Sequence, residues 1–277
     1  MKRTIKIIAS LLFITTVFAG CTAPHDLPDA HLKSNFATAD DVSWDDIVAK
    51  GTITIGYNDD NPPYAFHDES GKLVGFEIDL ANAAAKEIGI NIEFKTVTLG
   101  NLLNELSEGE IDLIWSNFRV TEERQEKILF TKPYIENSKS VITLKGSDII
   151  TLEDLKNANV GASGNPSLDD AINTAYEAGI ANITRYNDEI EAIDALDNGI
   201  VDAVIIDNVL LRYYNKARNH GGYTVLEENF GMDVFAVAAR QTEKFFVVEL
   251  QKAIDTIKSN GIASDISFKW FNDDLIK

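Results

Sequence analysis

One short pattern occurs twice in this chain, and each copy has the form of a helix end followed by a strand. Leu106-Ser-Glu-Gly-Glu-Ile-Asp112 recurs as Leu196-Asp-Asn-Gly-Ile-Val-Asp202. In each copy the Gly suits the left-handed position that ends many helices. The apolar residues after it predict a buried strand. Two such units indicate a fold that contains two related halves.

The residues five positions beyond the two aspartates are candidates for a ligand site. These residues are Asn117 and Asp207. Each should lie just past the carboxyl end of a strand, where open α/β sheets bind their ligands. A second interpretation of Asp207 is an N-cap for a helix over 208–217, because Asp is a preferred N-cap residue.

Strand and helix patterns alternate through most of the chain. The predicted strands are 52–56, 92–97, 159–162, 183–186 and 203–206, and the predicted helices are 78–88, 167–178, 189–198, 208–217 and 242–259. Such alternation predicts an α/β fold with parallel sheets and helices on both faces.

Two other segments have the composition of extended strands. Residues 138–145 and 233–240 lie near the two ends of the 146–232 block. A chain that leaves one lobe, builds a second and returns needs two crossovers of this kind, and they would form a hinge. The alternative is that both are ordinary strands within one sheet.

The segment Ile111–Arg124 places a cation at the start of a helix. Ile111 to Trp115 predict a buried strand, and Thr121 is a suitable N-cap for the helix that follows. A cation in the first turn opposes the helix dipole, so Arg124 is misplaced unless an anion binds there too. Helix N-terminal amides and a guanidinium both bind carboxylates. The alternative is a surface ion pair between Arg124 and a nearby Glu.

The N-terminus predicts secretion. Three basic residues precede an apolar run over 7–18, and Ala19, Gly20 and Cys21 follow. The run is too short to span a membrane but fits a signal peptide over residues 1–20. The small pair before Cys21 resembles a bacterial lipoprotein cleavage site, although Phe18 stands where Leu is usual. Acylation with palmitate at Cys21 would then provide a membrane anchor. The alternative is an unmodified cysteine.

Charge excludes some partners. The net charge is −19, and removal of residues 1–20 takes away three basic and no acidic groups, which leaves about −22. Nucleic-acid binding requires basic patches, so it is excluded as a function. Such a chain also does not adhere to anionic lipid by charge. Residues 21–43 contain few large apolar groups and predict a flexible tether behind the lipid anchor.

Seven motifs occur in the order found in one known family. They are Gly51–Gly56, Asn61–Tyr64, Gly71–Leu80, Gly109–Leu113, Thr121–Arg124, Phe130–Tyr134 and Val201–Val204. Together they closely resemble the polar amino-acid-binding proteins of ABC importers, which are bacterial extracellular solute-binding proteins of family 3. The resemblance covers about residues 44–271. It implies a type II periplasmic-binding-protein fold, with two Rossmann-like lobes joined by a two-strand hinge. Lobe 1 would be 44–139 plus 235–277, and lobe 2 would be 140–234.

The resemblance also implies ligand contacts. Arg124 matches the residue that pairs with the α-carboxylate of the ligand, and Asp207 matches the residue that receives its α-ammonium. The remaining implied contacts are Asn117 and Arg119 to the carboxylate, Ser167 at a helix start in lobe 2, Asn58 and Asn61 in the first-strand loop, and Leu99 as an apolar flank.

Several of these positions depart from the family pattern. Asn61 stands where the family has a stacking Tyr or Phe, Arg119 where it has Ser or Thr, and Asn58 where it often has Asp. An Asn165-Pro-Ser167 turn replaces a Gly-Thr-rich one. The charge changes disfavour a cationic ligand and favour a neutral polar or acidic one. Trp115 and Phe118 could supply aromatic contact, although Trp115 fits the core better.

The expected function is therefore that of an extracytoplasmic amino-acid-binding component of an ABC importer. Its partners would be an amino acid, a permease with its ATPase and, through the lipid anchor, the cell membrane. The protein would be a monomer without catalysis, cofactor or metal. One alternative is an enzyme on the same fold, such as a prephenate or arogenate dehydratase, which needs a general acid or base. The histidines, at 25, 31, 67 and 220, lie in the tether or in predicted turns. A ligand sensor or adhesin is the third interpretation.

Overall fold

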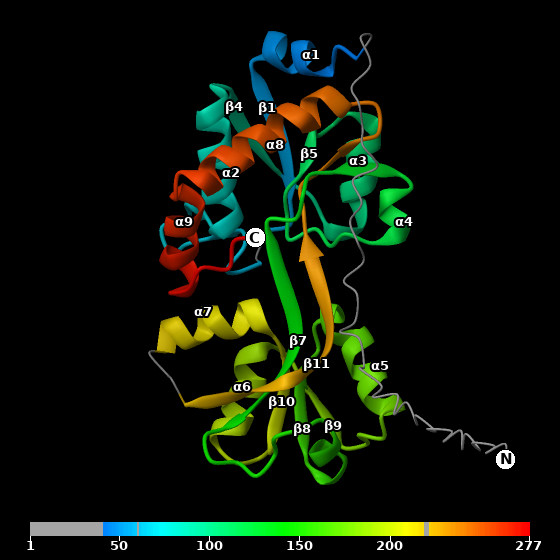
Figure 1. The fold of residues 1–277 in the computed structure, drawn as a ribbon, viewed down its shortest axis with the longest axis vertical. Helices are drawn as coiled ribbons and strands as arrows, with labels where there is room; N and C mark the ends of the chain where they lie inside the picture. Colours follow the sequence, from blue (N-terminus) through cyan, green and yellow to red (C-terminus); the bar gives the residue numbers. More distant parts are fainter. Residues whose placement is uncertain (1–40, 60, 219–221) are drawn as a thin grey trace, which may run out of the picture. The chain divides into compact units, whose positions relative to one another are not determined.

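A computed structural model describes residues 41–59, 61–218 and 222–277. The predicted signal peptide, Cys21 and most of the predicted tether lie outside these residues. The described chain forms two five-stranded sheets and one two-stranded hairpin, with helices packed around them (Figure 1). Both five-stranded sheets belong to one compact unit. We call the part around the first sheet lobe 1 and the part around the second sheet lobe 2.

Lobe 1 is built on a sheet with strand order β4-β1-β5-β12-β6. β1 runs parallel to β4 and to β5, whereas β12 is antiparallel to its neighbours. The strands are β1 Thr52–Tyr57, β4 Asn91–Thr96, β5 Leu113–Ile114, β6 Ile128–Phe130 and β12 Ala238–Arg240, and β2 Phe66–His67 with β3 Leu73–Val74 form the hairpin. The helices are α1 Ser43–Lys50, α2 Phe76–Ile88, η1 Leu99–Asn101, α3 Leu102–Glu108, α4 Glu122–Gln125, α8 Lys244–Ser259 and α9 Ile262–Phe271.

Lobe 2 is built on a sheet with strand order β11-β7-β10-β8-β9. β10, β8 and β9 are parallel, and β7 is antiparallel to both of its neighbours. The strands are β7 Ile135–Leu144, β8 Val160–Ser163, β9 Ile183–Tyr186, β10 Ala203–Asp207 and β11 Tyr223–Phe235. The helices are η2 Glu153–Asn157, η3 Pro166–Leu168, α5 Asp169–Glu177, α6 Glu189–Asp197 and α7 Asn208–Arg218. The predicted α/β fold and its alternation are thus confirmed. The prediction of parallel sheets is wrong in part, because β7 and β12 run antiparallel to their neighbours and both sheets are mixed.

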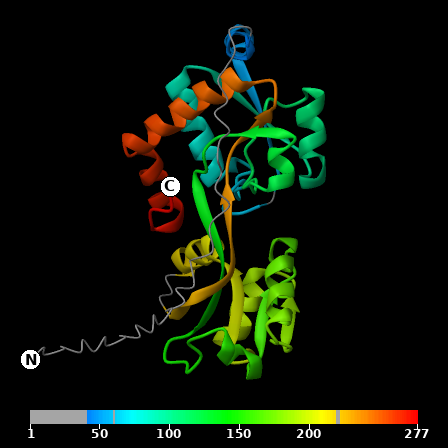
Figure 2. The same ribbon diagram turned by 45° about the vertical axis from the view of Figure 1, so that its right-hand side comes forward.

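Each lobe is built around apolar clusters, and α7 of lobe 2 adds Val209 and Leu210 to the main cluster of lobe 1. In lobe 1, α2, α8 and α9 contact one another (Figures 1 and 2), and Ile55, Phe76 and Phe246 are buried between helices and sheet. In lobe 2, residues such as Leu168 and Ile205 are fully buried. Trp115 belongs to the first core, so its interpretation as a core residue is confirmed.

The sequence prediction did not include helix α1. α1 begins at Ser43, at the end of the predicted tether. Asp41 accepts a hydrogen bond from the backbone N–H of Phe245, and the Ser43 hydroxyl accepts one from Phe246. Both side chains therefore hold the start of α8, and residues 41–43 differ from the predicted tether in being fixed to lobe 1.

Two neighbouring segments carry the chain between the sheets. Residues 131–134 lead from β6 to β7, and 236–237 lead from β11 to β12. They are bonded laterally, because Thr131 N donates to Val237 O (2.9 Å), Tyr134 N donates to Phe235 O (3.0 Å) and the Thr131 hydroxyl accepts from Val237 N. β7 and β11 then continue side by side as an antiparallel pair (Figure 1). Of the predicted segment 138–145, residues 138–144 lie in β7, whereas 233–240 runs from the end of β11 through 236–237 into β12. The lobe boundaries at 139/140 and 234/235 stay a prediction.

The repeated pattern has the same local structure in both copies. Gly109 and Gly199 end their helices with φ of 78° and 67°, values that favour glycine. The Asp112 carboxylate accepts a hydrogen bond from Thr54 N at 2.7 Å, and the Asp202 carboxylate accepts one from Asn159 N at 2.8 Å. Each Asp also donates its own backbone N–H to the same neighbouring residue. Each copy therefore fixes the entry of its strand beside the adjacent one.

Candidate functional site

A cavity of about 450 Å³ collects the predicted ligand contacts. Such a volume is typical of sites for small molecules. All of the predicted contacts line it, namely Asn58, Asn61, Leu99, Asn117, Arg119, Arg124, Ser167 and Asp207. It is also lined by residues that the sequence analysis missed, namely Tyr64, Lys139, Leu210, Asp233 and Phe235. The cavity lies between loops of lobe 1 and strand ends of lobe 2.

Arg124 is held at the start of α4 with its charge unpaired. Its backbone N–H donates to the Thr121 hydroxyl, which confirms Thr121 as the N-cap. The guanidinium lies 3.9 Å from the centre of the Phe118 ring and donates to the carbonyl of Arg119 at 2.7 Å. Burial lowers the pKa of Arg124, and the neighbouring Arg119 lowers it further. Within the described part of the chain it forms no ion pair, so the predicted alternative of a surface pair with Glu is wrong.

Asn117 is held by a buried carboxylate beneath the loop. Its backbone has φ of 38°, and its N–H donates to both carboxylate oxygens of Glu77, at 2.6 and 2.7 Å. The Tyr134 hydroxyl also donates to Glu77. Burial raises the pKa of Glu77 to about 7, although both donors oppose that rise. The loop is therefore fixed from below, and the Asn117 side chain accepts from Asn61 at 3.0 Å inside the cavity.

Asp207 ends β10 and is surrounded by donors. Its Oδ1 accepts from Asn137 Nδ2 at 2.6 Å and from Lys139 Nζ at 2.5 Å, and its Oδ2 accepts from the Ser167 hydroxyl at 3.0 Å. Lys139 also forms an ion pair with Asp233 at 3.0 Å. The N-cap interpretation of Asp207 is not supported, because the backbone N–H of Val209 donates to Asn137 instead. Asp207 thus faces the cavity as one member of a buried ionic group.

Two predicted contacts are already engaged with other residues. Arg119 Nη1 lies 3.4 Å from Asp233 Oδ1 and 3.5 Å from Asp170 Oδ2, and the side chain is 38% exposed. The backbone N–H of Ser167, expected to face a carboxylate, donates to the Asn165 side chain at 3.0 Å. The Asn-Pro-Ser turn therefore caps itself, and Ser167 presents its hydroxyl to Asp207.

The other two predicted contacts define the edge of the cavity. Leu99 is 59% exposed in η1, as an apolar flank at the rim would be. Asn58 follows β1. Its backbone N–H donates to the Ser116 hydroxyl at 2.9 Å, so this hydrogen bond uses the backbone of Asn58 and not its side-chain amide.

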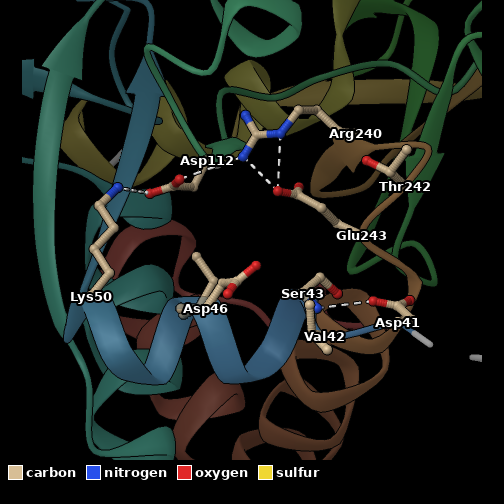
Figure 3. Close-up of a pocket in the computed structure, with 10 residues that line it drawn as sticks. Asp41, Val42, Ser43, Asp46, Lys50, Asp112, Arg240, Thr242 and Glu243 are labelled. Atoms are coloured by element: carbon tan, nitrogen blue, oxygen red, sulfur yellow. Dashed lines mark hydrogen bonds and ion pairs between the residues drawn. The ribbon is translucent and has the colours of Figure 1, made fainter. Parts of the chain in front are cut away.

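A second cavity of about 380 Å³ lies against α1 in lobe 1 (Figure 3). Its charged residues bind one another. Lys50 pairs with Asp112 at 2.7 Å, and Arg240 pairs with Glu243 at 2.5 Å (Figure 3). Because these cations already have carboxylate partners, this cavity offers no unpaired cation comparable to Arg124. Its ion pairs attach α1 and the repeat aspartate Asp112 to the rest of lobe 1.

The described residues, 41–59, 61–218 and 222–277, contain neither a metal-binding cluster nor a membrane-spanning helix. No group of His, Cys, Asp and Glu side chains there is arranged to hold a metal ion. No helix in the same ranges has the length and apolar character needed to cross a membrane. His67 is the one histidine within them, and it bonds Asp59 at 3.0 Å rather than lining the ligand cavity.

Comparison with known proteins places this geometry in a family. The model of bacterial extracellular solute-binding proteins, family 3, matches residues 53–273. The chain belongs to this family. This solute-binding protein is 30% identical over 251 residues to the glutamine-binding protein of Geobacillus stearothermophilus, covering 87% of this chain and 93% of that one. It is 26% identical over 241 residues to the L-cystine-binding protein TcyJ of Escherichia coli, covering 86% and 90%.

Solved structures agree with the family assignment. A polar amino acid ABC uptake transporter substrate binding protein from Streptococcus thermophilus is 31% identical, with a TM-score of 0.74 over 88% of this chain and 94% of that one. The predicted type II periplasmic-binding-protein fold is thereby confirmed. The named ligands of the relatives differ, so the choice of ligand by this solute-binding protein has to be argued from its own cavity.

Proposed function

We propose that this protein is the amino-acid-binding component of an ABC importer and holds its ligand in the cavity between the two lobes. One observation supports this most strongly. An unpaired, half-buried guanidinium on lobe 1 shares a cavity with the carboxylates of Asp207 and Asp233 on lobe 2. A zwitterion has the complementary pair of charges. The names of the relatives, which bind glutamine and cystine, support an amino acid as the ligand.

The proposed pose uses the two lobes at once. The α-carboxylate of the ligand pairs with Arg124, in the planar geometry that a guanidinium offers. The α-ammonium donates to Asp207, whose Oδ2 accepts one hydrogen bond, from Ser167, and has a further lone pair. Asn117 and Asn58 line the space between these ends.

The direct test is a thermal shift measurement against the common amino acids. A ligand that binds only the folded protein stabilises it by RT ln(1 + [L]/Kd). We expect at least one polar amino acid to raise the melting temperature at millimolar concentration, and calorimetry should then show one site per chain. A panel without any shift, together with no heat of binding, would overturn the proposal.

We also propose that ligand binding closes the lobes about the two connecting segments. Small-angle scattering should then give a smaller radius of gyration with saturating ligand than without it. An unchanged radius, with binding shown separately, would mean that the lobes do not move.

The location at the membrane is part of the same proposal. Residues 1–20 act as a signal peptide, and Cys21 carries the lipid anchor of a monomeric protein. In a bacterial host, labelled palmitate should be incorporated into the wild-type chain and not into Cys21→Ala, which should appear in the medium or periplasm. Light scattering of the soluble Cys21→Ala form should report the monomer mass.

The enzyme interpretation is tested by turnover. Glu77, the buried carboxylate beneath the cavity, is bonded to Asn117 and Tyr134 rather than exposed to the ligand. We therefore propose binding without chemistry. Incubation with prephenate-type acids should leave them unchanged, and any product above background would favour the enzyme instead.

A further inference from the structure

We infer that Lys139 makes the cavity selective for a ligand with net negative charge, so that the bound amino acid is an acidic one. This rests on the proposed function and deepens it by naming the ligand class. Lys139 lies in β7, directly opposite Asp207 in the pairing of β7 with β10. Its side chain is only 7% exposed, yet it lines the ligand cavity.

The ammonium group of Lys139 lies between two carboxylates. Lys139 Nζ lies 2.5 Å from Asp207 Oδ1 and 3.0 Å from Asp233 Oδ2. One protein cation therefore lies between the two carboxylates that would otherwise be available to a cationic ligand. An ammonium has three N–H donors, and these two carboxylates account for two of them. The third donor is available to a ligand group in the cavity.

The described residues that line the cavity carry more positive than negative charges. The cations are Arg119, Arg124 and Lys139, and the anions are Asp207 and Asp233. The lining therefore has one positive charge in excess, within a chain whose net charge is −19. Without Lys139 the lining would be balanced. A cavity of opposite sign to the rest of the protein favours an anion over a neutral zwitterion or a cation.

The side-chain carboxylate of an acidic ligand would have two cations as partners. With the α-carboxylate on Arg124 and the α-ammonium on Asp207, a side-chain carboxylate has Arg119 and the third donor of Lys139 as partners. Arg119 is held by Asp233 and Asp170 only at 3.4 and 3.5 Å, which are long contacts for charged hydrogen bonds. A glutamine side chain would bring no charge to these cations, and an arginine side chain would add a like charge beside them.

A purely structural role for Lys139 predicts something different. In that case the ion pair would only join β7 to β10 and β11. Removal of Lys139 would then lower stability and weaken every ligand by a similar factor. A specificity role instead changes the ratio of affinities between ligands that differ in charge.

The experiment is calorimetric titration of the wild-type protein with glutamate, glutamine, arginine and glutarate, the last being a dicarboxylate without an ammonium group. We expect glutamate to bind at least tenfold more tightly than glutamine, and arginine to bind most weakly. Glutarate should bind more weakly than glutamate, because it leaves Asp207 without a ligand donor. Lys139→Gln should lower the glutamate-to-glutamine affinity ratio at least tenfold.

Two further variants keep the test decisive. Lys252→Gln makes the same change in charge at an exposed lysine on α8 that pairs with Glu249 outside the cavity and the connecting segments, and it should leave the ratio unchanged. Asp233→Asn removes an anion from the same ionic group, so it should raise the ratio. This opposite change can be measured even if Lys139→Gln does not fold.

The outcomes separate this inference from the proposed function. A wild-type protein that binds glutamine or arginine more tightly than glutamate upholds the proposed function and overturns the inference. An unchanged ratio in both Lys139→Gln and Asp233→Asn also overturns it. A protein that binds no amino acid overturns the proposed function itself.

Discussion

The two copies of the repeated unit have a similar backbone, but the charged residues that follow them at the cavity differ. Arg124, which follows the first copy, has no partner of opposite sign among the described residues, whereas Asp207, which follows the second copy, has one. In lobe 1 the copy leads to Asn117 and to the unpaired Arg124, while its Asp112 is paired with Lys50 and Arg240, which do not line that cavity. In lobe 2 the copy leads directly to Asp207, which is paired with Lys139. The repeat therefore starts two strands in the same way, and the neighbouring strands and loops determine the charge and partners of the residues that follow.

Both lobes also support their cavity loops in a related way. Glu77 near the start of α2 lies beneath the loop of Asn117, and Glu189 at the start of α6 accepts from Ser163 and Asn165 beneath the lobe 2 turn. Glu77 binds a backbone N–H and a phenol, whereas Glu189 binds two side chains. Lobe 1 thus fixes the backbone of its site, and lobe 2 fixes side chains.

The largest effect should come from Arg124→Ala. This change removes the one cavity cation without a carboxylate partner in the described chain, so the bound ligand loses its main charge contact. Loss of one partner of a buried charge pair costs about 2–5 kcal/mol, so affinity should fall by at least tenfold in calorimetry while the protein stays folded. Lys127→Ala, an exposed neighbour that pairs with Glu123, is the control and should bind normally. If Arg124→Ala bound the ligand with wild-type affinity, the unpaired charge of lobe 1 would not be the main contact of the ligand.

The second largest effect should be a decrease in the free energy of unfolding with rising pH, caused by Glu77 in lobe 1. The pKa of Glu77 is about 7 in the folded protein and near 4.5 without burial. The folded state therefore keeps a proton that the unfolded state releases, so this contribution is complete below pH 4.5 and is lost as pH rises through 7. It amounts to about 3 kcal/mol at most. Urea unfolding at several pH values should show that Glu77→Gln lacks this decrease.

The control for that measurement is Glu87→Gln, on the exposed face of the same helix. It should retain the pH dependence of the wild-type protein. If Glu77→Gln and the wild type lose stability equally between pH 4.5 and 7.5, the buried carboxylate is not the cause.

The third comparison changes the repeat aspartates themselves. Asp112 is buried with two cationic partners, whereas Asp202 is exposed and bonded to Asn159. Asp112→Asn should therefore lower the free energy of unfolding by roughly 2–4 kcal/mol, because it removes the carboxylate partner of Lys50 and one of the two carboxylate partners of Arg240. Asp202→Asn should cost about 1 kcal/mol. Equal losses in denaturant titrations would show that the ion pairs of Asp112 contribute little.

The smallest loss of stability should come from replacing the glycine of each repeat by alanine, and it should be the same in both lobes. Gly109 and Gly199 have positive φ, and an added Cβ would contact nothing within 4 Å at either position. Alanine at each site should cost only the backbone strain, about 1 kcal/mol. Thermal unfolding of Gly109→Ala and Gly199→Ala should give shifts that agree closely. A large difference would mean that the two helix ends are not equivalent.

The sequence predicted the parts of this molecule that depend on local patterns. The repeat led to Asp207, which is the last residue of β10, and to Asn117, which lies three residues beyond β5, and the misplaced cation led to Arg124. Lys139 was missed because it lies in a strand that otherwise seemed apolar, and only the pairing of β7 with β10 shows that it meets Asp207. Asp233 and Phe235 were missed for the same reason, because only the pairing of β11 with β7 brings them beside the cavity. α1 was missed because its contacts are with α8, at the other end of the chain.

The lateral hydrogen bonds between residues 131–134 and 235–237 restrict how the lobes can move. Two strands bonded edge to edge bend readily across their flat face but resist sliding past each other. In the closure proposed above, the relative motion of the lobes would therefore be close to a single rotation. A ligand that closed the cavity in this way would order that single coordinate rather than the full translation and rotation of two independent bodies. Most of the entropy cost of bringing the two half-sites together would then be met when the chain folds, and binding energy would be available for discrimination between ligands.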